Sequence, residues 1–454
     1  MNSVVILGLA RQGKALARFF AGRGARVVVS DRREAAALEP MLEELAGLDV
    51  EYAFGGHPLS LLDGADLLCI SGGVPADLPL VQEARRRGIP VTNDAQEFLR
   101  RCPAPVIGIT GSAGKTTTTS LVGQMVREAG FTTWVGGNIG NPLLNDLGAM
   151  SPEDRVVMEL SSFQLEIMDV SPQVAGVLNI TPNHLDRHGT MEVYRAAKAN
   201  VVTHQGRGDV AILGYDEPDA RALASLTDAR VRYFSGAVEV EEGAFLREGV
   251  LLLRRKGAEQ EVCRREDLRL RGFHNVLNTL AAIALADAGG APVAAMQRAI
   301  AAFAGVEHRL EEVGRHRGVL WVNDSIATTP ERVLAALDAF EEPLVLLVGG
   351  RDKDLPWEAF ARRVVERVRL LILFGEAQAL IAEQVTGVSA ELRDAGALEA
   401  VVGAGTLEQA VAEAARRARP GEVVLLSPGG TSFDAFRDFA ARGERFRQLV
   451  GELA

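Results

Sequence analysis

A glycine-rich loop that carries a lysine and two threonines directly follows an apolar run at residues 106–110. Its residues stand in the order Gly108-x-x-Gly111-Ser112-x-Gly114-Lys115-Thr116-Thr117. In such a strand–loop–helix unit, backbone N–H groups and a helix N-terminus converge on one point and stabilise a phosphate chain. The loop departs from the full G-x-x-x-x-G-K-[ST] pattern in where its glycines fall, but the pattern still predicts an ATP site. We expect Lys115 to reach the β- and γ-phosphates and the Thr116 hydroxyl to bind Mg²⁺. The alternative, a glycine-rich strand-to-helix turn, leaves the adjacent Lys-Thr-Thr unexplained.

Two further polar side chains follow predicted buried strands. Glu159 ends one apolar run, and His184 follows the run at 174–180. If these strands are parallel to the one that feeds the loop, their carboxyl ends meet at the sheet edge where open α/β sheets bind ligands. We therefore expect both side chains beside the phosphates. Taken alone, His184 is more typical of a structural histidine, and Lys198, in the helical segment 191–204, of a solvated surface lysine.

The first 93 residues have the pattern of a Rossmann-type unit. A strand at 4–7 leads into Gly-Leu-Ala-Arg-Gln-Gly at 8–13, and a second strand at 27–30 is followed by Asp31. Ala10 departs from the dinucleotide fingerprint. Three interpretations therefore remain open from this motif: NAD, another nucleotide, or tight helix–strand packing only.

The alternation of strands and helices predicts an α/β protein of three domains. We expect a Rossmann-like domain over 1–93, a central P-loop domain with a parallel sheet over 94–304, and a Rossmann-like C-terminal domain over 305–454. Short alternating segments between 233 and 266 predict β-hairpins on a flank of the central domain. In the third domain, glycine and proline loops end four predicted strands, which indicates a second ligand-binding edge.

Composition narrows the function classes. The 454 residues carry a net charge of −11, which argues against a nucleic-acid partner because phosphate backbones need clustered Lys and Arg. The three cysteines lie far apart and have no metal-ligand spacing. No apolar run has the length needed to cross a bilayer, and the first residues lack the pattern of a signal peptide. We expect a cytoplasmic protein without a membrane partner.

A set of motifs in a fixed order closely resembles the Mur ligase family. The motifs are Ile-Thr-Gly-Ser-Ala-Gly-Lys-Thr-Thr at 109–117, Gly-Gly-Asn-Ile-Gly at 136–140, Glu-Leu-Ser-Ser-Phe-Gln-Leu-Glu at 159–166, Asn-Ile-Thr-Pro-Asn-His-Leu-Asp-Arg at 179–187, Tyr-Arg-Ala-Ala-Lys at 194–198, His-Asn-x-x-Asn at 274–278, Glu-His-Arg at 307–309 and Asn-Asp-Ser at 323–325. They span nearly the whole chain. Within the family, the Rossmann-like first domain and the ending Leu-Ser-Pro-Gly-Gly-Thr-Ser at 426–432 resemble the D-glutamate-adding branch.

The resemblance implies an ATP-dependent amide-bond-forming ligase. ATP would phosphorylate the terminal carboxylate of UDP-N-acetylmuramoyl-L-alanine (UDP-MurNAc-L-Ala), and the amine of D-glutamate would attack the acyl phosphate. The family also implies two Mg²⁺ ions and small-molecule substrates, and we expect a monomer. Another ATP-dependent amino-acid ligase, of another Mur branch or of the folylpolyglutamate synthase type, is the rival enzyme. A P-loop module that switches a partner is the non-enzyme alternative.

Matching positions assign roles to individual residues by resemblance. Lys115, Glu159, His184 and Lys198 would be catalytic; Thr116 and Glu159 would hold one Mg²⁺, and His184 and Lys198, the latter carbamylated by CO₂, would serve the second. ATP would contact Gly111, Ser112, Gly114, Lys115, Thr116, Thr117, Asn275, Asn278, Arg309 and Asp324. The UDP-sugar would contact Asp31, Arg32, Ser71, Asn138 and Gln164, and D-glutamate would contact Thr328, Lys353, Ser432 and Phe439. The chain departs from the family at Ile326, where some members carry lysine, and at Ala113, where asparagine is frequent.

Overall fold

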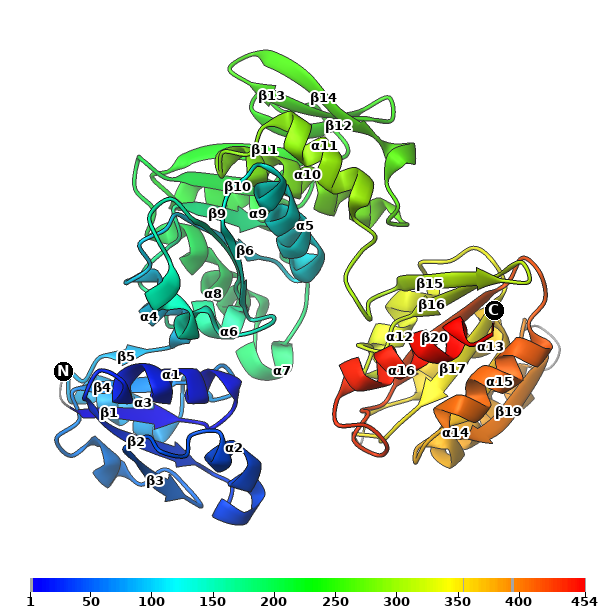
Figure 1. The fold of residues 1–454 in the computed structure, drawn as a ribbon, viewed down its shortest axis with the longest axis horizontal. Coiled ribbons are helices and arrows are strands. Elements are labelled where there is room, and N and C mark those ends of the chain that lie inside the picture. The colour runs from blue at the N-terminus through cyan, green and yellow to red at the C-terminus, as the bar shows by residue number, and fades with distance from the viewer. Residues whose placement is uncertain (1–2, 354, 393–395, 454) are drawn as a thin grey trace. The chain divides into compact units, whose positions relative to one another are not determined.

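The computed structural model describes residues 3–353, 355–392 and 396–453, and it contains three β-sheets with helices on their faces (Figure 1). Two compact units divide the chain. The first unit runs to Leu268 and includes Phe273–Phe303, and it holds two of the sheets. The second unit comprises Arg269–Gly272 and the residues from Ala304 onward, and it holds the third sheet. The predicted three-domain α/β fold is confirmed.

The first sheet is parallel throughout, in the order β3-β2-β1-β4-β5. Its strands are β1 (Ser3–Leu7), β2 (Arg26–Asp31), β3 (Val50–Phe54), β4 (Leu67–Ile70) and β5 (Val91–Thr92), accompanied by helices α1 (Arg11–Ala21), α2 (Glu39–Glu43) and α3 (Pro79–Arg86). Helix α1 lies so close to the turn after β1 that a Cβ on Gly13 would be 1.8 Å from the Gly8 carbonyl oxygen. Only glycine allows this approach, which explains the second glycine of the motif.

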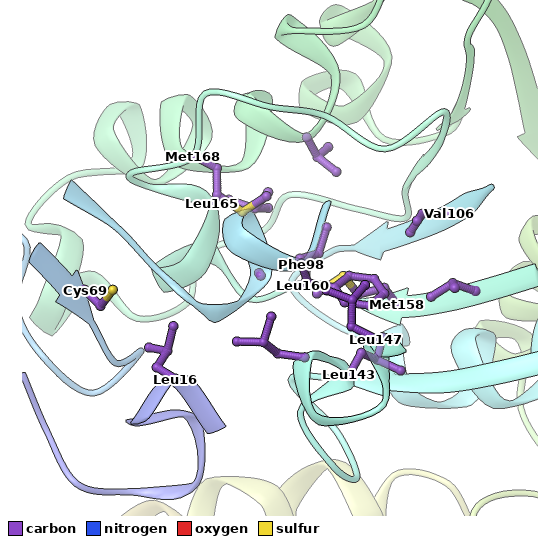
Figure 2. Packing of buried hydrophobic residues seen from close by; sticks show 14 of the residues in the cluster. Leu16, Cys69, Phe98, Val106, Leu143, Leu147, Met158, Leu160, Leu165 and Met168 are labelled. Carbon is purple, nitrogen blue, oxygen red and sulfur yellow. The ribbon is translucent and has the colours of Figure 1, made fainter. Parts of the chain in front are cut away.

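Helix α4 (Asp94–Leu99) joins the first sheet to the central one. Its cap residue Asn93 accepts a hydrogen bond from the Gln96 N–H and donates through its side chain to the Gln164 carbonyl (2.8 Å). Phe98, fully buried, belongs to a hydrophobic cluster that contains both Leu16 of the first sheet's layer and Met158 of the central sheet (Figure 2). The two sheets of this unit therefore share one core.

The central sheet has nine strands in the order β14-β13-β12-β11-β10-β9-β6-β8-β7. The strands are β6 (Val106–Thr110), β7 (Thr133–Gly137), β8 (Arg155–Glu159), β9 (Val174–Val177), β10 (Val210–Gly214), β11 (Arg230–Ser235), β12 (Gly243–Arg247), β13 (Val250–Arg255) and β14 (Ala258–Arg264). The helices are α5 (Lys115–Glu128), α6 (Ser162–Leu165), α7 (Leu185–His188), α8 (Met191–Thr203), α9 (Pro218–Ala222), α10 (Phe273–Ala288) and α11 (Val293–Ala302). β6 lies between β8 and β9 and is parallel to both, so the three strand ends meet at one edge as predicted. The expected hairpins are β12–β14, which are antiparallel.

The third sheet has the order β15-β16-β20-β17-β18-β19, and only the β15–β16 pair is antiparallel. Its strands are β15 (Glu311–His316), β16 (Val319–Asn323), β17 (Leu344–Gly349), β18 (Val368–Phe374), β19 (Ala400–Gly405) and β20 (Val423–Gly429). Its helices are α12 (Pro330–Leu337), α13 (Glu358–Arg367), α14 (Gln378–Leu392), α15 (Leu407–Arg417) and α16 (Phe439–Gly451). Alternate strand residues enter two separate cores, one on each face, as expected of a parallel sheet covered on both sides. Among the residues described, no helix is long and apolar enough to span a membrane.

Candidate active site

The glycine-rich loop connects β6 to α5 and packs against α10. Gly114 has a left-handed backbone (φ +82°), and a Cβ there would be 2.2 Å from Asn278 Oδ1. Asn278 in turn donates to Asn275 Oδ1 (3.0 Å). The structure therefore brings the loop together with two residues expected to contact ATP, although they lie more than 150 positions further along the chain.

Lys115, the first residue of α5, lies folded over the loop. Its Nζ donates to the carbonyl oxygens of Gly111 (2.8 Å) and Ser112 (3.3 Å). The Ser112 hydroxyl donates to the Thr181 carbonyl (2.9 Å) and is 3.0 Å from the Tyr194 hydroxyl. The amine of Lys115 is thus held against the loop, and Ser112 anchors the loop to the segment after β9.

Glu159, at the end of β8, accepts hydrogen bonds from two polar side chains at the carboxyl edge of the central sheet. Its side chain is buried, with 2% of the residue exposed. Thr116 donates its hydroxyl to Oε2 (2.8 Å), and Asn138 donates its side-chain amide to Oε1 (2.8 Å). A carboxylate beside a hydroxyl at a phosphate-binding loop supplies the hard oxygen ligands that Mg²⁺ prefers, so these residues fit a magnesium ion. Thr117, which follows Thr116 in the chain, is buried within α5.

No group of three or more His, Cys, Asp and Glu residues that could hold a metal occurs within the described ranges. The set expected for the two ions contains only two residues of these types, Glu159 and His184. Its other members are a threonine and a lysine, so a metal site of this composition does not depend on such a group.

Taken alone, the sequence around Lys198 predicted a solvated surface lysine, and this prediction is wrong. Only 1% of the residue is exposed, and its Nζ donates to the Gly111 carbonyl (2.9 Å) and to the Thr110 hydroxyl (3.3 Å). Burial lowers the pKa of Lys198 well below its usual range; the charge of Lys115 lowers it further, against the opposing effect of Glu159. The reason for the error is that α8 packs this face against the loop. A buried amine of low pKa is the neutral form that reacts with CO₂.

His184 caps the short helix α7 with a left-handed backbone (φ +54°). Its ring lies 5.0 Å from the ring of Phe163, on the segment that follows Glu159. Phe163 also stacks on His188, whose Nε2 is 3.0 Å from the Ser162 hydroxyl. The ring of His184 therefore packs on α6, the short helix that follows β8.

Two of the residues expected to bind the UDP-sugar, Asp31 and Ser71, form hydrogen bonds within the protein. Asp31 accepts from the backbone N–H of Leu9 (2.8 Å) and from the side chain of Arg33 (2.8 and 3.0 Å). Burial raises the pKa of the Asp31 carboxyl, but these hydrogen bonds and the Arg33 charge outweigh it and bring the pKa below its usual range. Ser71 donates to the Gly8 carbonyl (3.0 Å). Arg32 is exposed beside them.

Arg11 was not anticipated as a site residue. It begins α1 and donates to the carbonyl oxygens of Asn138 (2.8 Å) and Gly140 (2.6 Å). Because Asn138 also donates to Glu159, hydrogen bonds run from the Gly8–Gly13 turn to the ATP loop. Gln164, also expected to bind the UDP-sugar, forms a capping box with Ser161 at the start of α6. The sequence offered no signal for Arg11 beyond its place at a helix N-terminus.

In the second unit, Asp324 follows β16 and is buried. It accepts from the Leu310 N–H (3.2 Å) and from the hydroxyl of Ser427 (2.8 Å), a partner the sequence did not indicate. Burial raises the pKa of Asp324 to about 7, against the hydrogen bond from Ser427 and the charge of Arg309. The charges of Arg309 and Arg332 also act on Asp324 and oppose the effect of burial.

Three of the four residues expected to bind D-glutamate lie on loops at the carboxyl edge of the third sheet. Lys353 is solvent-exposed; partial burial of its amine and the charge of Arg332 lower its pKa. Ser432 is buried and follows β20, whereas Thr328 is half-buried and precedes α12. Phe439 begins α16, and its carbonyl accepts from the Ser325 hydroxyl (2.8 Å).

Comparison with known proteins defines the class. The family model for the Mur ligase MurD-like N-terminal domain matches residues 2–93, that for the Mur ligase middle domain matches 109–286, and that for the Mur ligase glutamate ligase domain matches 308–430. The chain belongs to the Mur ligase family.

Relatives and solved structures agree with this assignment. The chain is 43% identical over 455 residues to the UDP-N-acetylmuramoylalanine--D-glutamate ligase of Geotalea uraniireducens, covering all of this chain and 98% of the relative. It is 40% identical over 453 residues to the enzyme of the same name from Pelotomaculum thermopropionicum, with the same coverage. The structure of UDP-N-acetylmuramate-alanine ligase from Thermotoga maritima matches with a TM-score of 0.59 and 20% identity over both whole chains, which indicates a shared fold.

Proposed function

We propose that this protein joins D-glutamate to UDP-MurNAc-L-Ala with hydrolysis of ATP to ADP and phosphate, in peptidoglycan precursor synthesis. Relatives of 36–43% identity over the full chain carry the name of this ligase. The observation from the structure that supports it best is the arrangement of Thr116 and Asn138 on the two oxygens of buried Glu159. That arrangement suits phosphoryl transfer, which depends mainly on positioning and charge neutralisation.

The chain's own groups account for the steps. The loop amides and Lys115 would hold the phosphates of ATP and stabilise the charge that develops during transfer to the alanine carboxylate. The resulting acyl phosphate is a good acyl donor, and the neutral amine of D-glutamate would attack it, so that phosphate leaves from a tetrahedral intermediate. Mg²⁺, held by Thr116 and Glu159 with a second ion served by His184 and Lys198, would neutralise phosphate charge.

Lys198 is proposed to act as a carbamate. Its buried, low-pKa amine is the form that adds CO₂, and the product is an anionic oxygen ligand in place of a cation. The hydrogen bond from Lys198 Nζ to the Gly111 carbonyl, in the loop expected to bind ATP, supports this proposal.

The remaining assignments extend the proposal. ATP would also be bound by Asn275, Asn278, Arg309 and Asp324. The UDP-sugar would be bound by Asp31, Arg32, Ser71, Asn138 and Gln164. D-Glutamate would be bound by Thr328, Lys353, Ser432 and Phe439. Domain boundaries at 93/94 and 304/305, a cytoplasmic location and a monomeric state belong to the same proposal.

The direct test is phosphate release by the purified protein with ATP, Mg²⁺ and UDP-MurNAc-L-Ala, across a panel of amino acids. We expect turnover with D-glutamate and none when either substrate is omitted. Turnover with UDP-MurNAc and L-alanine, or with a folate and L-glutamate, would instead support another ligase. ATP turnover that is indifferent to every amino acid would support a nucleotide-binding module.

A further inference from the structure

Arg11, the first residue of α1, connects loops that belong to two different sheets. Its Nη1 donates to the Gly140 carbonyl (2.6 Å) and its Nη2 to the Asn138 carbonyl (2.8 Å). Both acceptors follow β7 of the central sheet, whereas Arg11 follows β1 of the first sheet. Because the guanidinium group is planar, two such hydrogen bonds fix the acceptor loop in position and in orientation.

The segment 137–140 is also held against Glu159. The backbone N–H of Asn138 donates to the Glu159 carbonyl (2.9 Å), and its side-chain amide donates to Glu159 Oε1 (2.8 Å). Gly137 has a positive φ of +100°, and a Cβ there would be 2.5 Å from the Glu159 carbonyl oxygen. The segment therefore lies between Arg11 on one side and Glu159 on the other, with direct contacts to both.

The turn that carries Arg11 is itself fixed to the next strand end of the first sheet. Gln12 accepts a hydrogen bond from the Gly72 N–H through its side chain (2.8 Å), and Ser71 donates to the Gly8 carbonyl (3.0 Å). A displacement at either end of this turn is thus transmitted to the guanidinium group.

The positive charge of Arg11 also acts on the buried carboxyl of Asp94. Burial raises the pKa of Asp94 to about 6, and a hydrogen bond from Gln164 (3.4 Å), backbone hydrogen bonds and the charge of Arg11 oppose that rise. Arg11 therefore interacts with Asn138 directly and with the partner of Gln164 electrostatically. Both residues are among those proposed to bind the UDP-sugar.

These contacts form one continuous chain from the first sheet to the proposed magnesium site. Asn138 is proposed to bind the UDP-sugar, and it is also a hydrogen-bond partner of Glu159, which is proposed to hold the Mg²⁺ of ATP. A ligand that orders one end of such a chain reduces the conformational entropy that a second ligand must lose at the other end. The effect is reciprocal, since each ligand changes the affinity of the other by the same factor.

We propose that Arg11 is a positioning residue that couples UDP-sugar binding to Mg²⁺–ATP binding, by holding the segment 137–140 between the first sheet and Glu159. This inference rests on the proposed function and adds a residue to it. A merely structural arginine would change the unfolding temperature and leave the coupling factor unchanged. A direct phosphate ligand would change UDP-sugar affinity equally with and without nucleotide.

The test compares Arg11→Met and Arg11→Lys in the full-length protein, with Arg18→Met as the control. Arg18 lies on the same helix and donates to Glu44, away from the segment 137–140. Calorimetric titration gives the Kd of UDP-MurNAc-L-Ala with and without Mg²⁺ and the non-hydrolysable ATP analogue AMP-PNP. Arg11 is exposed, so the variants should fold, and the unfolding temperature of each verifies this.

We expect AMP-PNP to tighten UDP-sugar binding about 10-fold in the wild type and in Arg18→Met, within the usual range of coupling between two sites. In Arg11→Met the factor should fall to about 3-fold or less, because substitutions along a coupling network have effects of this size. Arg11→Lys keeps the charge but not the planar fork, so its factor should lie between the two.

A second comparison tests the route of the coupling. Asn138→Ala removes the amide that binds Glu159, so adding Arg11→Met to it should reduce the coupling factor no further. Losses that multiply in the double variant would show that Arg11 does not act through Asn138, and would overturn the inference.

The inference would also be overturned by an unchanged coupling factor in Arg11→Met, by the absence of coupling in the wild type, or by UDP-sugar binding that weakens equally with and without AMP-PNP. The wild type separates the two proposals. D-Glutamate-dependent phosphate release with normal coupling in Arg11→Met would reject only the role of Arg11. A wild type that neither binds UDP-MurNAc-L-Ala nor responds to D-glutamate would reject both.

Discussion

Lys198 combines near-complete burial with a position against the ATP loop, and both follow from the face of α8 on which it lies. Tyr194, one turn earlier, lies beside it, with the Lys198 Nζ 4.9 Å from the ring centroid. Burial and the ammonium of Lys115 disfavour a cation there, against the opposing effects of Glu159 and of the Tyr194 ring.

Replacing Lys198 tests whether the side chain works as an oxygen ligand. We expect Lys198→Ala to lose activity by about 10²-fold or more, as when one transition-state contact is removed. Added acetate should restore part of the rate by filling the vacated oxygen position, and removing bicarbonate should slow the wild type reversibly. Lys256→Ala, at an exposed position, should respond to neither treatment. Rescue by small amines instead of acetate would make Lys198 a phosphate-contacting cation.

Asp324 makes stability depend on pH in a definite direction. Its pKa in the folded protein is about 7, above the ordinary 3.8, so the folded state binds this proton more tightly than the unfolded state. The stability it contributes is complete below about pH 4 and is lost as pH rises through about 7. An asparagine side chain in its place would keep the acceptor for Leu310 and could donate to Ser427, without ionising.

We therefore expect Asp324→Asn to gain stability relative to the wild type between pH 5 and pH 8. The expected difference is about 2.7 kcal/mol, because roughly two pKa units, from pH 5 to the folded pKa of about 7, contribute 1.36 kcal/mol each. Urea unfolding at both pH values measures the difference. A difference that is constant with pH would show that Asp324 does not titrate in this range.

At the scale of elements, the contact between the ATP loop and α10 rests on Gly114. Gly114→Ala introduces left-handed strain and a clash with Asn278, whereas Gly130→Ala introduces similar strain (φ +94°) with nothing within 4 Å. The control should cost about 1–2 kcal/mol. Gly114→Ala should lose more stability and also raise KM for ATP. Equal losses in the two variants, with normal KM for ATP, would contradict the role of the contact.

The sequence predicted the buried strands well because parallel strands covered on both faces are continuous apolar runs, as in β6, β8 and β17. It did not predict β3, β7, β15 or β19, which are edge strands whose residues are largely exposed or half-buried, so they lack an apolar run. It also missed β10, a buried strand between β9 and β11.

Side-chain environment was harder to infer than secondary structure. The loop, Glu159 and His184 followed from strand ends, a local property. The burial of Lys198 and of Arg442, on α16, did not, because it depends on which helix face packs against loops distant in sequence. In its sequence context, Ala-Ala-Arg-Gly-Glu-Arg, Arg442 looks like any surface arginine.

At the scale of the whole molecule, the two compact units have separate cores, so calorimetry should resolve more than one unfolding transition. We expect Gly114→Ala to lower the transition of the first unit and Arg442→Met, which removes buried hydrogen bonds to Ser325 and Gly430, that of the second, each leaving the other in place. A single transition that both variants shift equally would mean that the units unfold cooperatively.

The place of β20 has a consequence for biosynthesis. It is the last strand of its sheet in chain order, yet it lies between β16 and β17 and bonds to both. When the ribosome has produced β15 to β19, the strand β20 that joins the pair β15–β16 to the strands β17–β19 is still missing. The first unit's sheets can form early during translation, but the proposed amino-acid pocket must wait for β20 and α16. Until then β16 and β17 are each unpaired along one side, and such open apolar strand edges favour aggregation at this stage of synthesis.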